Sequence, residues 1–204
     1  MTEQTKRIRK YDRQAEMYAR RRANHAEQEW RKRLIGDAAG HVLEVACGAG
    51  ANFPYYPQGV RVTAVDFSEA MLEYAAGAAQ RHGVEAEFRR ADVETLDFPP
   101  DSFDTVVSTL SLCGYERPDR VLASFARWAK PGGRILLMEH GLSHNVLFAA
   151  GQRAFNPLFR CINGCNMNRD IPALLAASPL RVLRMERHML GTIFLIWAEP
   201  AKPA

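Results

Sequence analysis

The sequence has no long apolar run, and this absence restricts the classes of protein to which the chain can belong. Although 47% of its 204 residues are hydrophobic, no stretch approaches the roughly 18 to 20 consecutive apolar residues of a membrane-spanning helix. The N-terminus is charged from Lys6 onward and has no short apolar segment, so we expect no secretory signal. A single cytoplasmic α/β domain fits this composition.

Cysteine is scarce, and its placement does not indicate disulfides or a metal centre. A chain of this length buries enough apolar surface to fold without disulfides, so we expect four reduced thiols. Cys47 and Cys113 are interpreted as small apolar side chains of the core. Cys161 and Cys165 are four residues apart and could meet on one face of a helix. His140, His144 and His188 are the available further ligands, and we expect no metal.

Glycine and proline are absent from residues 6–35, which predicts one or two helices. Residues 1–33 carry eleven Lys or Arg against five Asp or Glu, whereas the remaining residues are slightly acidic. We therefore divide the chain into a basic helical arm, residues 1–37, and a main domain, residues 38–204. A narrow apolar stripe at helical spacing follows the first helix of the arm, formed by Ile8, Tyr11, Ala15 and Tyr18.

Three interpretations of the arm remain open. The stripe can pack the helix on the main domain, the helix can form a lid over a ligand, or it can lie on an anionic membrane surface as a peripheral contact. The lid and membrane interpretations are compatible. Two basic clusters, residues 20–22 and 31–33, have no RNA-binding signature beside them, so we expect no nucleic-acid partner.

β-rich runs alternate with helical patterns along the main domain. Strands are predicted at residues 42–45, 60–65, 86–90, 103–109, 134–139, 181–188 and 192–198, and helices at residues 69–82, from Pro118 onward, at 145–159 and at 171–177. This order predicts an α/β fold of the Rossmann-like, doubly wound type. Its seven-stranded sheet would be mostly parallel, with an antiparallel hairpin at the C-terminus.

The first predicted strand ends in a glycine-rich turn at residues 46–52. Gly48 and Gly50 allow a sharp bend and a close approach of the backbone to a ligand, and a helix is expected directly after the turn. The second strand ends at Asp66, where a carboxylate can accept hydrogen bonds from ribose hydroxyls. A dinucleotide site requires a third glycine at position 53, which is Phe53, whereas Asp92 suits the amine of an adenine.

These motifs together resemble the class I S-adenosylmethionine-dependent methyltransferases, with matching segments at residues 43–50, 65–68, 91–93, 103–107 and 130–133. The residues around Tyr11 and Tyr18 resemble the N-terminal motif of the ubiquinone/menaquinone methylases. The resemblance implies S-adenosylmethionine as cofactor. It also implies a cofactor site formed by Tyr11, Tyr18, Ala46, Cys47, Gly48, Gly50, Asn52, Asp66, Phe67, Met71, Asp92, Val93 and Thr109. The family has glycine where this chain has Ala46, which implies a slightly less close approach to the methionine part of the cofactor.

A narrower resemblance is to the methyltransferase-like thiol methyltransferases of animal membranes. It includes residues 50–57, 109–113 and 138–140, and a distinctive segment at residues 164–169. Residues 1–204 contain no counterpart of the hydrophobic N-terminal anchor of those proteins, so we do not expect membrane residence to carry over. This resemblance implies a small-molecule thiol as methyl acceptor. A phospholipid amine, a quinone-like hydroxyl and a cofactor-binding protein without catalysis remain the alternatives.

Methyl transfer requires mainly that the acceptor is positioned and that water is excluded. Glu139 and His140 end the fifth predicted strand, next to the expected methyl group, and His140 is the candidate base or orienting group for a protonated acceptor. The apolar helix at residues 146–159 either caps a substrate pocket or belongs to the core, and the sequence does not choose between the two.

Overall fold

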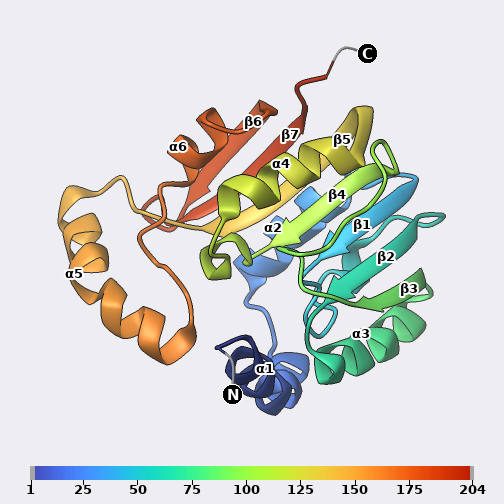
Figure 1. The fold of residues 1–204 in the computed structure, drawn as a ribbon, viewed down its shortest axis with the longest axis horizontal. Helices are drawn as coiled ribbons and strands as arrows, with labels where there is room; N and C mark the ends of the chain where they lie inside the picture. Colours follow the sequence, from blue (N-terminus) through green and yellow to red (C-terminus); the bar gives the residue numbers. More distant parts are fainter. Residues whose placement is uncertain (1–2, 203–204) are drawn as a thin grey trace.

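The computed structural model describes residues 3–202 and contains one seven-stranded sheet (Figure 1). The strand order is β3-β2-β1-β4-β5-β7-β6. The strands are β1 (His41–Val45), β2 (Arg61–Asp66), β3 (Glu85–Arg90), β4 (Phe103–Thr109), β5 (Ala129–His140), β6 (Leu180–His188) and β7 (Ile193–Pro200). Strands β1 to β5 run parallel, and β7 lies antiparallel between β5 and β6. The predicted fold class and C-terminal hairpin are confirmed.

Helices cover both faces of the sheet because each face carries apolar side chains. On one face, α4 (Pro118–Trp128) and α6 (Ile171–Ala176) pack on the sheet through side chains that include Phe125 and Trp128. On the other face, α2 (His25–Ile35) and α3 (Glu69–His82) enclose a second apolar cluster that includes Leu34 and Ile35. The arm's second helix is thus part of the core, while the domain boundary at residue 37 stays a prediction.

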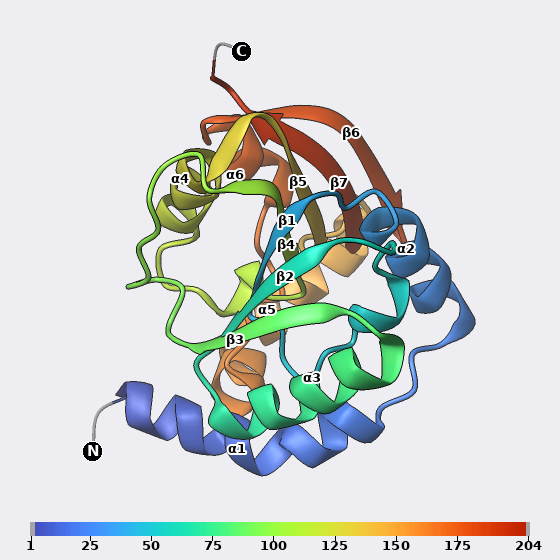
Figure 2. The same ribbon diagram turned by 90° about the vertical axis from the view of Figure 1, so that its right-hand side faces the viewer.

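Two helices lie outside these layers. Helix α1 (Glu3–Arg20) runs along α3 below the sheet, and α5 (Val146–Asn163) projects to one side of it (Figures 1 and 2). In Figure 1, α1 lies between α3 and α5, below the ends of the central strands. Of the residues that the structure describes, none forms a helix long and apolar enough to cross a bilayer.

The prediction of a helix directly after the glycine turn was wrong. A three-residue 3₁₀ helix, η1 (Phe53–Tyr55), follows the turn instead. Pro57 explains the difference, because it lacks the N–H that a continuing helix needs and favours the extended backbone that Tyr56 adopts. The ring of Phe53 is buried beneath Gly50 and does not border the ligand site.

Candidate active site

The glycine turn adopts backbone conformations that explain its composition. Gly48 and Gly50 have φ values of 53° and 84°, in the left-handed region that glycine reaches without strain. Ala46 has a φ of 49°, also left-handed, which costs about 1 to 2 kcal/mol for a residue with a Cβ. This cost gives a physical reason why the class I methyltransferases, which the sequence resembles, have glycine at this position.

Two carboxylates lie at the carboxyl ends of the adjacent strands β2 and β3: Asp66 is the last residue of β2, and Asp92 follows β3. Asp66 accepts the backbone N–H of Gly48 and that of Ser68, each at 2.9 Å, so it joins the glycine turn to the start of α3. Burial raises the pKa of Asp66 against these hydrogen bonds, which lower it. Asp92 accepts the backbone N–H of Glu94 at 3.1 Å and pairs with the Arg7 guanidinium of α1 at 2.5 Å.

A cleft of about 1700 Å³ opens along the carboxyl ends of the parallel strands, between the glycine turn, α1 and the end of α5. Twelve of the thirteen residues predicted to bind the cofactor line it. They are Tyr11, Tyr18, Ala46, Cys47, Gly48, Gly50, Asp66, Phe67, Met71, Asp92, Val93 and Thr109. Asn52, Glu139 and His140 lie behind the wall of this cleft.

Asn52 belongs to a buried polar network that joins α2 to strands β1 and β4. Its side-chain amide donates to Glu44 at 2.8 Å and to Thr109 at 3.1 Å, and its carbonyl oxygen accepts Arg31 at 2.5 Å. Tyr56 donates its hydroxyl to the other oxygen of Glu44 at 2.8 Å. Burial raises the pKa of Glu44 to about 7, although these hydrogen bonds lower it.

The sequence reasoning missed Arg31 as a site residue because it stands in a basic run. The structure buries its side chain beside the cleft, where Glu27 accepts its guanidinium at 2.9 Å. The spacing of four residues between Glu27 and Arg31 within one helix was the available signal.

Glu139 is fully buried and shapes the loop that follows β4. Its carboxylate accepts the backbone N–H groups of Ser111 at 3.0 Å and Leu112 at 3.1 Å, and the hydroxyl of Ser108 at 3.0 Å. Burial raises the pKa of Glu139 to about 7, opposed by these hydrogen bonds. The geometry makes Glu139 a residue that positions the cleft wall.

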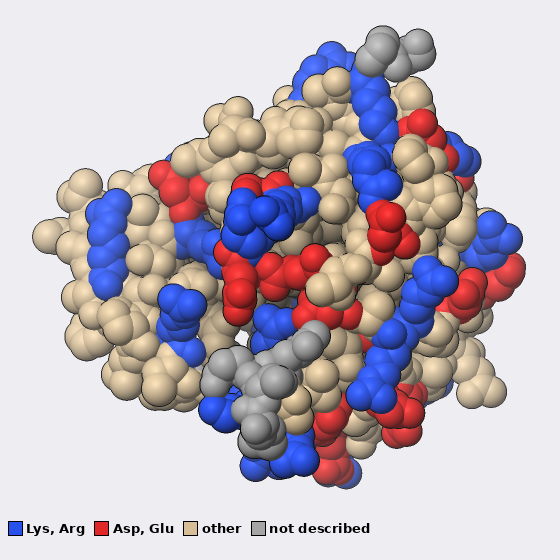
Figure 3. Space-filling model, in the orientation of Figure 1, with Lys and Arg blue, Asp and Glu red and all other residues tan. Residues whose placement is uncertain are grey.

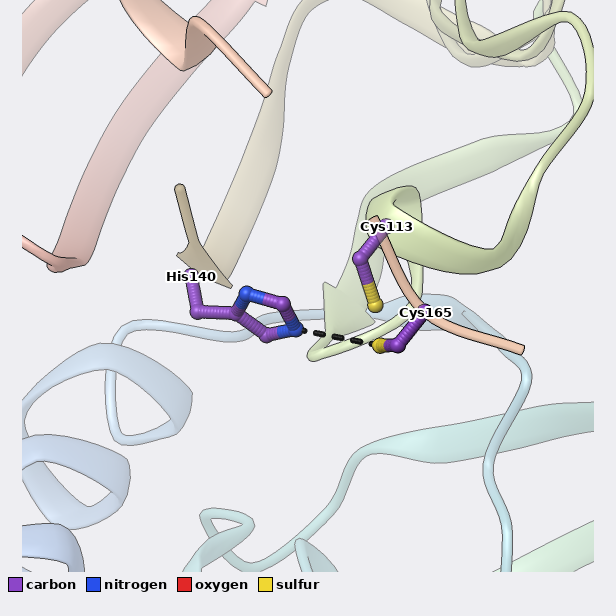
Figure 4. A group of neighbouring side chains, drawn as sticks. All are labelled: Cys113, His140 and Cys165. Carbon is purple, nitrogen blue, oxygen red and sulfur yellow. Dashed lines mark hydrogen bonds between the residues drawn. The ribbon is translucent and has the colours of Figure 1, made fainter. Parts of the chain in front are cut away.

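His140 forms a cluster with two cysteines that are distant in sequence (Figure 4). Its Nε2 atom lies 3.2 Å from the Sγ atom of Cys165, and the Cys113 thiol lies beside both. Cys165 does not share a helix face with Cys161, although the spacing of the two residues would allow it. Gly164 ends α5 in a left-handed conformation, with a φ of 73°, and places Cys165 in the following loop.

The charges of the cluster favour a thiolate at Cys165. A hydrogen bond from Cys113 lowers the pKa of Cys165 to about 5, burial opposes this shift, and His140 and Arg169 add to it. The same hydrogen bond raises the pKa of Cys113. Burial lowers the pKa of His140, but the hydrogen bond to Cys165 and the charges of Cys165 and Glu139 raise it overall.

The cleft as a whole is basic. Eleven Lys or Arg side chains line it, against five Asp or Glu. Figure 3 shows acidic and basic groups side by side at the centre of the face that Figure 1 presents to the viewer. Near the cysteine cluster, the buried Nε of Arg169 has no hydrogen-bond partner among the described residues, while its Nη2 donates to the carbonyl of Tyr115. This end of the cleft suits an anionic or thiolate group.

Comparison with known proteins places the chain in a family. The sequence model described as Methyltransferase domain matches residues 43–137. The chain is 35% identical to the human thiol S-methyltransferase TMT1B over 164 residues, which are 77% of this chain and 67% of that protein. The chain belongs to the S-adenosylmethionine-dependent methyltransferases. This methyltransferase is also 35% identical to a phosphatidylethanolamine N-methyltransferase of Cereibacter sphaeroides, over 59% of its own length and 60% of that relative's length.

A solved structure with a bound cofactor product shares the fold. The geranyl diphosphate C-methyltransferase of Streptomyces coelicolor, in complex with Mg²⁺, geranyl diphosphate and S-adenosyl-L-homocysteine, superimposes with a TM-score of 0.66 at 15% identity. The match covers 86% of this methyltransferase and 78% of that chain.

The glycine turn and the acidic strand ends fit S-adenosylmethionine, the cofactor of this family. A Cβ built on Gly48 would meet no atom within 4 Å, so the backbone beside the cleft is open to a ligand. The N–H groups of Gly48 and Ser68 reach different oxygens of Asp66, and a carboxylate with about four lone-pair sites can accept a ribose hydroxyl in addition. Tyr11 and Tyr18 of α1 border the same cleft and pack together, with ring centroids 6.4 Å apart.

Proposed function

We propose that this methyltransferase transfers the methyl group of S-adenosylmethionine to the sulfur of a small thiol. The observation that carries the proposal is the cluster of Cys113, His140 and Cys165 at the basic cleft, with the charge of Arg169 close to both cysteines. A thiol attacks as its thiolate, and cationic surroundings favour that form. The identity with the human thiol S-methyltransferase supports the same acceptor class.

The residues of the cleft divide into three roles in this proposal. S-adenosylmethionine, when bound, supplies an electrophilic methyl group. The glycine turn, Asp66 and Asp92 hold its adenosine part, and Tyr11 covers the cleft from α1. His140 orients the acceptor or takes its proton through the cluster, and Glu139 positions the loop at Ser111 that forms the acceptor wall.

A phospholipid amine is the second candidate acceptor, because the relative from Cereibacter sphaeroides is named for that reaction. Ammonium groups are usually bound by carboxylates or aromatic faces. The excess of cations along the cleft opposes such a group and favours the thiol. A quinone-like hydroxyl and cofactor binding without catalysis are the remaining alternatives.

The test is formation of S-adenosylhomocysteine by the 204-residue protein supplied with S-adenosylmethionine and with alkyl thiols, phosphatidylethanolamine vesicles or phenols. We expect turnover with thiols alone, and we expect Asp66→Ala to abolish it by weakening cofactor binding. Turnover with amines or phenols but not with thiols would refute the thiol assignment. Tight cofactor binding without turnover on any acceptor would identify a binding protein.

We also propose that the protein docks on an anionic membrane surface, with α5 as the main contact. The helix exposes large apolar side chains, among them Leu147 at 83% and Phe155 at 61% of their full area. Its charged residues are Arg153 and Arg160, and no acidic residue occurs between Gly141 and Arg169. In Figure 3 the lobe of α5 is tan with isolated blue patches. Apolar and basic groups on one exposed helix are typical of interfacial binding.

A further inference from the structure

The cluster of Cys113, His140 and Cys165 has the composition and spacing of a metal site. One ligand atom from each residue lies within 4.8 Å of the other two, and Figure 4 shows the imidazole and both sulfur atoms pointing toward one another. The ligand atoms of a tetrahedral zinc site are about 3.3 to 3.8 Å apart, given bond lengths of 2.0 to 2.3 Å. The separation of 3.2 Å between Nε2 of His140 and Sγ of Cys165 is close to this range.

We propose that these three residues bind a zinc ion whose fourth position faces the cleft. Two thiolates and an imidazole are ligands that zinc prefers, and three protein ligands with one open position are typical of catalytic zinc. Cys113 and Cys165 border the cleft while His140 lies behind them. The proposed site departs from the prediction of no metal, which considered Cys165 together with Cys161.

The fold holds the three ligands in place before a metal binds. His140 ends β5, and Cys113 follows β4, its parallel neighbour in the sheet. The loop that carries Cys165 is tied to the second ligand, because Asn166 donates its backbone N–H at 3.0 Å and its side-chain amide at 3.1 Å to the carbonyl of Cys113.

A second anchor ties the same loop to the end of β5. The side-chain amide of Gln152, in α5, donates to the carbonyls of Gly141 and Met167, each at 3.0 Å. Gln152 is buried, and its carbonyl oxygen accepts the N–H of Ser143 at 2.8 Å. Hydrogen bonds that orient the segments behind the ligands are a regular feature of metal sites.

The open position would bind the acceptor as a thiolate, a role that rests on the proposed thiol specificity. The thiol replaces a water at the ion, a sulfur–zinc bond forms, the S–H bond breaks, and the proton leaves through the cleft to solvent. The sulfur keeps its electron pair for attack on the methyl group. His140 then acts as a ligand rather than as a base.

The metal content of the 204-residue protein tests the site without reference to turnover. Reduced protein is incubated with zinc, desalted and analysed by elemental mass spectrometry. We expect one zinc per chain, at least a tenfold loss in Cys113→Ala, His140→Ala and Cys165→Ala, and no loss in Cys161→Ala, whose thiol is exposed outside the cluster. Zinc well below one per chain in the parent protein, or equal zinc in all variants, would refute the site.

Cobalt substitution of the parent protein provides a readout that requires no variant. We expect the charge-transfer band of thiolate–cobalt bonds and the strong visible bands of a tetrahedral ion. Adding an alkyl thiol without S-adenosylmethionine should shift the visible bands, and an alkylamine or a phenol should not. Absence of the thiolate bands would refute the site. Visible bands that do not shift when an alkyl thiol is added would refute its proposed role in binding the acceptor. Thiol turnover by protein without zinc would support the proposed function and refute the role of the metal in binding the acceptor.

Discussion

Glu44 is a buried carboxyl group whose ionisation makes the stability of the fold depend on pH. Its carboxyl group releases its proton near pH 4.5 in an unfolded chain but near pH 7 in the folded protein. The folded state therefore holds more protons between these values, and its stabilisation is present below pH 4.5 and is lost as the pH rises through 7. We predict that the parent protein loses about 2 to 3 kcal/mol of unfolding free energy relative to Glu44→Gln between pH 5 and pH 8.

Urea unfolding of both proteins at the two pH values measures this difference. Glutamine keeps a carbonyl for Asn52 and an amide for Tyr56, so the comparison isolates the charge. Glu85→Gln, at the exposed start of β3, serves as the matched control and should show no such trend. A difference between parent and Glu44→Gln that is independent of pH would show that Arg31 keeps the folded carboxylate ionised at pH 5.

At the scale of elements, α1 is the segment positioned to control access to the cofactor site. Its Arg7 pairs with Asp92, the carboxylate expected to receive the adenine amine, and its Asp12 accepts the hydroxyl of Ser68 at 2.5 Å. Because Arg7 and adenine compete for Asp92, we predict that Arg7→Gln binds S-adenosylhomocysteine about tenfold more tightly, corresponding to ~1.4 kcal/mol. Titration calorimetry measures the affinity.

Arg9→Gln is the control on the same helix, because its side chain is exposed. It should leave the affinity unchanged. Weaker binding by Arg7→Gln would show instead that Arg7 helps to hold the cofactor, and that α1 completes the site rather than competing for it.

Elements with local end signals were predictable from the sequence. Helix α3 spans Glu69–His82 as expected, since Ser68 accepts the N–H of Met71 and Gly83 ends the helix in a left-handed conformation. The position of Cys165 was not predictable in this way. It depends on where Gly164 ends α5 and on hydrogen bonds to the loop after β4, which are contacts between segments about 50 residues apart.

In the cofactor site, too, features set by strand order were predictable from the sequence, whereas contacts between distant segments were not. Asp66 and Asp92 were predictable because parallel strands end at one edge of a sheet, so their position follows from topology. The approach of Arg7 to Asp92 joins residues 85 positions apart and depends on how α1 packs across α3. No local pattern in the arm specifies that packing, which is why three interpretations of the arm were compatible with the sequence.

At the scale of the whole molecule, the distribution of apolar and charged surface predicts how the protein meets a membrane. One interpretation of the sequence placed the membrane contact in the basic arm. In the structure, however, α1 lies against α3, whereas α5 exposes Leu147 to solvent. We predict that Leu147→Glu lowers binding to anionic phosphatidylglycerol vesicles at least tenfold, about 1.4 kcal/mol or more, because it removes an inserted side chain and adds repulsion. Glutamate suits the first turn of a helix, so α5 should remain folded.

Vesicle sedimentation at physiological salt measures this binding, with circular dichroism to confirm the fold. Leu183→Glu is the matched control, because Leu183 is also exposed, at 58%, but lies on β6. It should sediment with vesicles as the parent protein does. Alanine replacement of the arm's arginines at 20–22 should reduce binding less than Leu147→Glu, because insertion of α5 supplies most of the free energy and the arm adds only a screened attraction. The opposite order, with α5 variants unaffected, would return the membrane contact to the basic arm.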